Sequence, residues 1–74
     1  MEIYYKKDTL YVNVDEYLNN SSMSNIRKRV FSIIDDYDIE NIVLNIIGNV
    51  EDNELLDDFI REYKMKYDGN IKIR

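Results

Sequence analysis

The spacing of apolar and polar residues predicts a β-hairpin at the start of the chain. Ile3, Tyr4 and Tyr5 form a short run of branched and aromatic residues, the types that favour strands. Between residues 9 and 14 every second side chain is apolar, namely Leu10, Val12 and Val14, which is the period of a half-buried strand. The polar segment 6–8 between these two runs suits a tight turn, so we expect the two strands to pair.

A long helix is predicted after the polar loop 15–22. Its apolar side chains recur at spacings of three and four and so lie on one stripe: Ile26, Val30, Ile33, Ile34 and Tyr37. Ser21 or Ser22 is expected to cap its first turn. The basic triplet 27–29 falls mostly on the outer face. Acidic residues at 35, 36 and 38 oppose the helix dipole, so the helix should fray or stop sharply there.

A second helix is predicted to begin at Asp52 or Asn53, either of which can act as its N-cap. Its first turns are acidic and its last turns basic, which complements the helix dipole. Gly69 is expected to end it in the left-handed conformation. Its apolar face is made by Leu55, Leu56, Phe59, Ile60, Tyr63 and Tyr67.

Two further strands complete the chain. Residues 41–47 are almost all branched and apolar, which is typical of a strand covered on both faces, and residues 71–74 alternate like an edge strand. The order β-β-α-β-α-β predicts a single α/β domain over residues 1–74. It should have a four-stranded mixed sheet with both helices packed mainly on one face. The other face should carry Tyr4 or Tyr5, Tyr11, and Val43 or Leu44.

Composition excludes several kinds of chemistry. The 74 residues include no Cys and no His, so zinc bound by thiolate or imidazole and nucleophiles activated by His are ruled out. A net charge of −5 argues against binding to a phosphate backbone. No apolar run approaches the roughly 20 residues that span a bilayer, and no signal peptide is visible. We therefore expect a cytoplasmic protein without cofactor, metal, nucleic-acid or membrane partner.

The acidic pairs and the tyrosines are further candidate sites. Asp35–Asp36 and Asp57–Asp58 could bind a divalent metal for an enzyme, but adjacent helical residues point about 100° apart, so solvated surfaces are favoured and no catalytic activity is expected. Packing in the core explains Tyr37, Tyr63 and Tyr67. The tyrosines of the hairpin, by contrast, could form an aromatic patch of the kind that marks association sites. These are Tyr4, Tyr5 and Tyr11.

The segment LNNSSMSNIRKRV, residues 18–30, resembles the loop and first helix of the STAS domain, the fold of bacterial anti-sigma factor antagonists and of sulfate transporter tails. Residues 38–45, DIENIVLN, resemble its third strand, commonly written I-x-x-I-V-L-[DN]. Residues 61–64 and 68–71 resemble the end of its second helix and its fourth strand. The resemblance extends over nearly the whole chain.

The chain departs from the STAS pattern in three ways. The antagonists carry a phosphorylatable serine at the start of the second helix, where this chain has EDNELL at residues 51–56 and no Ser or Thr after Ser32. The aspartate expected after Leu18 is Asn19. Family members usually continue for a further helix and strand, whereas this chain ends after its fourth strand.

The resemblance implies a non-catalytic protein-interaction module whose partner is an anti-sigma factor or a kinase-like regulator, bound without phosphorylation control. The expected contacts are Asn19, Asn20, Ser21, Asp52, Asn53 and Glu54. The acidic start of the second helix is interpreted as a good N-cap, with imitation of a phosphate as the alternative. The alternative function is a structural homo-oligomer, such as a homodimer, that pairs through the exposed sheet face or the edge strand 71–74.

Overall fold

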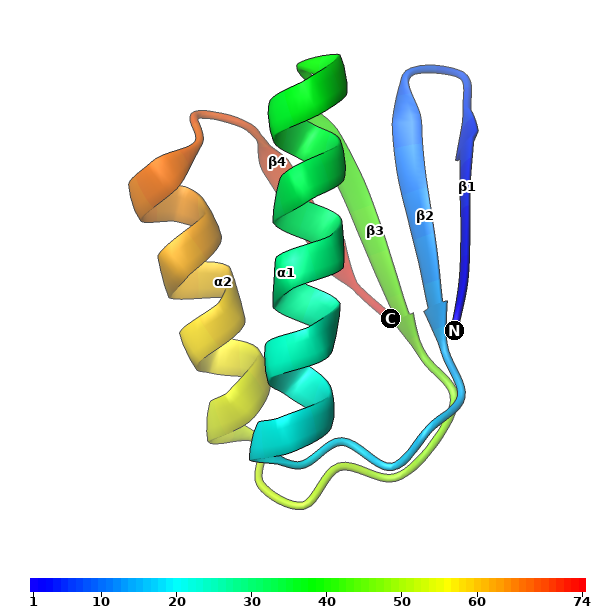
Figure 1. The fold of residues 1–74 in the computed structure, drawn as a ribbon, viewed down its shortest axis with the longest axis vertical. Helices are drawn as coiled ribbons and strands as arrows, with labels where there is room; N and C mark the ends of the chain where they lie inside the picture. The colour runs from blue at the N-terminus through cyan, green and yellow to red at the C-terminus, as the bar shows by residue number, and fades with distance from the viewer.

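The predicted fold class is confirmed by the computed structural model, which describes residues 1–74. A mixed sheet of four strands, in the order β1-β2-β3-β4, carries two helices on one side (Figure 1). β1 is antiparallel to β2, while β2, β3 and β4 are parallel to one another. The elements are β1 (Glu2–Lys6), β2 (Thr9–Val14), α1 (Asn20–Tyr37), β3 (Asn41–Ile46), α2 (Glu54–Lys66) and β4 (Asn70–Ile73).

The hairpin closes through a two-residue turn. Lys7 and Asp8 both have positive φ angles, 49° and 63°, which is the left-handed pair of a type I′ turn. Such a turn matches the twist of the two strands it joins, and it aligns Lys6 with Thr9 and Tyr4 with Tyr11. This register decides which side chains of β1 share a face with those of β2.

The core lies between the helices and one face of the sheet. Leu10 and Val12 of β2 are paired in register with Ile42 and Leu44 of β3, and all four are almost fully buried. No polar or charged residue is buried, so packing of apolar groups holds the two layers together. The helices contribute Met23, Ile26, Val30, Phe31, Ile34, Phe59 and Tyr63.

The other face of the sheet is free of helices, so the expectation that β3 is covered on both faces is wrong. The register places Tyr4, Tyr11, Val43 and Lys72 in one row across this open face. The rings of Tyr4 and Tyr11 stack with centroids 5.0 Å apart. Val43 is only 9% exposed, because it lies in the row between two long side chains. Neighbouring side chains therefore replace a second layer.

The end of α1 differs in part from the sequence expectation. The helix stops sharply at Tyr37, which is one of the two outcomes expected from the sequence. Asp38 follows with a φ of 53° and donates its N–H to the carbonyl of Ile34. The prediction that Tyr37 packs in the core is wrong, since its side chain is 74% exposed. It lies beside β1, where neither helix closes over the sheet.

Gly69 serves a purpose other than the expected left-handed cap. No glycine has a positive φ, and α2 ends at Tyr67 with extended backbone. A Cβ atom at Gly69 would overlap the hydroxyl of Tyr63 and the carbonyl oxygen of Glu40. Because Tyr63 donates its hydroxyl hydrogen to that carbonyl at 3.2 Å, residue 69 must be small for the chain to pass.

Tyr67 connects the end of α2 to the end of α1. Its ring meets the edge of Phe31 at 5.5 Å, and its hydroxyl donates to the carboxylate of Asp35 at 2.7 Å. The pKa of Tyr67 is raised to about 12, mainly by burial of the hydroxyl and secondly by its hydrogen bond to Asp35. The acidic end of α1 thus gains a specific partner.

We expect this pKa shift to make the folded state less stable at high pH. Below pH 10 Tyr67 is protonated in both states, but between about pH 10 and 12 the unfolded chain loses this proton while the folded chain keeps it. The free energy of unfolding therefore falls with rising pH in this window. Tyr67→Phe should make that fall shallower in urea unfolding series, whereas Tyr17→Phe, at an exposed position, should leave it unchanged. Equal slopes for the two variants would contradict this assignment.

Candidate functional site

The loops that follow β2 and β3 run side by side. Leu18 and Val50 form a parallel bridge, in which Leu18 donates its N–H to the carbonyl of Asn49 at 2.9 Å and Glu51 donates to the carbonyl of Leu18 at 2.8 Å. These bonds continue the parallel pairing past the ends of the strands, and both loops turn back below the helices (Figure 1). The two predicted binding segments, 19–21 and 52–54, are therefore brought to the same end of the sheet, which we call the loop end.

Two features fix the loop end. The side chain of Leu18 is fully buried, which anchors the first loop to the core. Gly48 lets the two loops approach closely, because a Cβ atom there would lie 2.8 Å from the carbonyl oxygens of both Asp15 and Glu16. The backbone at the loop end is thus held by the fold itself.

Asn19 is the N-cap of α1, so the expectation of Ser21 or Ser22 as cap is wrong. The side-chain oxygen of Asn19 accepts the N–H of Ser22 at 2.9 Å, and the hydroxyl of Ser22 accepts the N–H of Asn19 at 2.9 Å. This reciprocal pair is a capping box. Asn20 and Ser21 are exposed and make no side-chain hydrogen bond within the chain. Of the three residues, only these two keep free side chains.

At the start of α2 the cap is made by Asp52. Its carboxylate accepts the N–H of Glu54 at 2.9 Å, while Asn53, although it occupies the N-cap position, has helical backbone and no side-chain capping bond. Asp52, Asn53 and Glu54 are all exposed. Glu54 and Asp57 place negative charge in the first turn, where the helix dipole favours it. The side chains of Asn53 and Glu54 are therefore free for a partner.

Between the first turns of the two helices lies a small cleft of about 80 Å³. Deeper along the helices, Arg27 bridges α1 to Glu62 of α2 at 3.1 Å. Arg27 is half-buried, whereas Lys28 and Arg29 are exposed, so the basic triplet lies mostly outside as predicted. A cleft this small suits a protein side chain better than a substrate. It is lined by Asn20, Met23, Arg27, Leu55, Asp58 and Phe59.

All four side chains of the acidic pairs are exposed, and one member of each pair has a partner within the chain. Asp58 binds Arg61 at 2.9 Å, and Asp35 accepts the hydroxyl of Tyr67. No group of three or more acidic side chains is placed to hold a metal ion. What the loop end presents is a polar, acidic surface.

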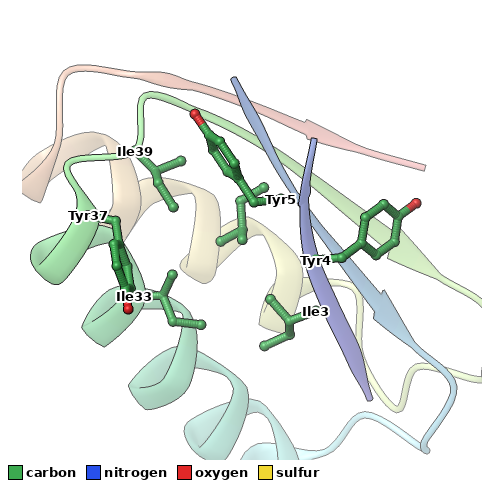
Figure 2. A pocket seen from close by; sticks show the side chains of 7 residues that line it. Ile3, Tyr4, Tyr5, Ile33, Tyr37 and Ile39 are labelled. Atoms are coloured by element: carbon green, nitrogen blue, oxygen red, sulfur yellow. The ribbon is translucent and has the colours of Figure 1, made fainter. Parts of the chain in front are cut away.

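An apolar groove beside β1 was missed by the sequence reasoning. It has a volume of about 630 Å³ and opens between β1 and the last turns of α1 (Figure 2). Tyr5 and Tyr37 are 55% and 74% exposed there. The side chain of Tyr4 points to the other side of β1. The sequence predicts the apolar side chains of β1 and of α1, but it does not predict that a gap remains between these two elements. The groove is lined by Ile3, Tyr4, Tyr5, Leu10, Ile33, Tyr37 and Ile39.

Comparison of the chain with protein-family models, with curated proteins and with solved structures gave no match. Neither helix combines the length and the apolar character needed to cross a membrane.

The capping role of Asn19 can be separated from a binding role. Asn19→Ala removes the acceptor for the N–H of Ser22, so we expect the free energy of unfolding to fall by about 1 kcal/mol. Asn20→Ala, the matched control, removes no bond and should change stability by less than about 0.5 kcal/mol. Urea unfolding of both variants measures the difference. Equal stability of the two would show that the capping box contributes nothing.

Proposed function

We propose that this chain is a non-catalytic protein-interaction module that docks on another protein through its loop end. The observation that carries the proposal is the Leu18–Val50 bridge, which joins the two loops into one surface. Side chains on both loops are exposed and unbonded there, so they can bind a partner without breaking contacts within the chain. They are Asn20, Ser21, Asn53 and Glu54.

The charge of the loop end selects the chemistry of the partner. Glu51 and Glu54, on either side of the capping residue Asp52, are both exposed. Their surface favours a partner with basic side chains or free N–H donors. Because the backbone beneath is fixed by the loop pairing, little conformational entropy is lost on binding.

The STAS resemblance supports a partner of one class, an anti-sigma factor or a kinase-like regulator. The absence of any hydroxyl side chain at the start of α2 favours binding that phosphorylation does not control. The hydrogen bond from the N–H of Glu54 to Asp52 supports a capping role for that carboxylate, ahead of phosphate imitation. In this proposal Asn53 and Glu54 are the contacts, and Asp52 shapes the helix start.

Binding to purified anti-sigma factors and kinase-like regulators from the source genome tests this proposal. We expect one of them to bind the wild-type chain and to bind Glu54→Lys at least about tenfold more weakly, because the substitution places positive charge against a basic partner. Asp36→Lys makes the same charge change at an exposed site on the far end of α1 and should bind like wild type. No binding by any candidate, or equal losses in both variants, would sink the proposal.

Asp52→Asn separates the cap from phosphate imitation. Asparagine keeps an oxygen for the N–H of Glu54 but has no charge. We therefore expect the equilibrium constant of unfolding, measured in urea, to stay within about twofold of wild type. Partner affinity, measured in the same binding assay, should also stay within about twofold. Lost affinity with unchanged stability would instead support phosphate imitation.

A further inference from the structure

β1 is an edge strand with an unpaired outer side. It pairs only with β2, and the two-residue turn makes Lys6 and Thr9 a hydrogen-bonded pair. Because bonded and non-bonded pairs alternate along an antiparallel ladder, Tyr4 also bonds to β2, whereas Ile3 and Tyr5 direct their N–H and C=O groups outward. The outer side of β1 can therefore accept another strand.

The sequence of β1, EIYYK, is complementary to itself in the antiparallel direction. If a second copy pairs about a twofold axis at Tyr4, Glu2 of each copy lies opposite Lys6 of the other, and Ile3 lies opposite Tyr5. Ile3 and Tyr5 are also the residues with outward-facing backbone groups, so charge pairing and hydrogen bonding require the same register. We propose that two copies of this chain join through their β1 strands in this register, which merges their sheets into one.

The dimer also covers apolar surface that the single chain leaves exposed. An axis perpendicular to the sheet keeps the helices of both copies on the same side, so the apolar groove of one copy continues into that of the other. Ile3 and Tyr5 of the second copy extend its floor, next to Tyr37, which is 74% exposed in the single chain. Burial of these apolar groups adds to the backbone bonds of the new ladder.

On the open face of the single chain, Glu2 is already held where it can meet Lys6 of a second copy. Asn13 donates to the carboxylate of Glu2 at 2.8 Å, which holds that side chain over the sheet and leaves its second oxygen for Lys6 of the other copy. The stacked pair Tyr4–Tyr11 would meet the same pair across the axis. Opposite charges directly across a ladder stabilise it, and like charges destabilise it.

The other edge lacks this complementarity. β4 contains Lys72 and no acidic residue, and Arg74 directly follows the end of the strand. Antiparallel pairing of two β4 strands about Lys72 would place like charges opposite each other. The sequence analysis named the edge strand 71–74, which belongs to β4, as the place where copies pair. The charges of the two edges favour β1 instead. The loop end does not include β1, so this proposal and the proposed function can fail separately.

Charge-swap variants test the dimer by sedimentation velocity at about 1 µM to 1 mM, a range that covers weak protein association. We expect a concentration-dependent dimer of the wild-type chain. Glu2→Lys alone and Lys6→Glu alone should each weaken it about tenfold or more, because each reverses two symmetry-related pairs. An equimolar mixture of the two variants should restore it, since the new lysine of one copy then faces the new glutamate of the other. Lys72→Glu is the control and should leave the dimer unchanged.

Amide hydrogen exchange distinguishes pairing through the edge from stacking through the open face. In the proposed dimer the N–H groups of Ile3 and Tyr5 should exchange at least about tenfold more slowly as the chain concentration rises, because both become hydrogen-bonded. A folded monomer at every concentration, or a dimer without this protection, would overturn the proposal. So would a mixture that fails to recover, or a dimer weakened by Lys72→Glu.

Discussion

Burial of one sheet face under α1 and α2 is the constraint on which the rest of the structure depends. With no cysteine to form a disulfide, the small domain relies on the packed rows of β2 and β3 beneath the helices for its stability. Two helices cover only part of such a sheet. The open face, and the stretch of β1 beside Tyr37, remain exposed for that reason. These exposed surfaces follow from the placement of both helices on one face of the sheet.

The same constraint shapes the loop end. Parallel strands that share a core also share the direction in which they leave it, so the loops after β2 and β3 emerge together and pair through Leu18 and Val50. Capping then uses part of the polar sequence in each loop, namely Asn19 with Ser22 in one and Asp52 in the other. The polar side chains beside these caps, on Asn20, Ser21, Asn53 and Glu54, make no capping hydrogen bond. We therefore propose a binding role for these neighbours of the caps rather than for the caps themselves.

What could be predicted from the sequence was set by local patterns. The hairpin turn, the two helices, the alternation in β2 and the order of elements all depend on neighbours within a few residues, and each is confirmed. One error is local, since Asn19 rather than Ser21 or Ser22 caps α1. The other errors lie where distant segments decide. Gly69 is required by Tyr63 and Glu40, and Tyr37 is exposed because nothing packs over it beside β1. The sequence likewise does not predict that the loops carrying the two binding segments pair through Leu18 and Val50.

Charge distinguishes the two proposed interaction surfaces. A chain with a net charge of −5 repels its own copies, so self-association needs a surface whose charges compensate one another across the axis. β1 has that property, with one acidic and one basic residue at its two ends. The loop end, with Glu51, Asp52 and Glu54, does not, and two copies would repel each other there. We therefore propose the acidic loop end as the surface for a partner of opposite charge, and the edge of the sheet as the surface for a second copy of the chain.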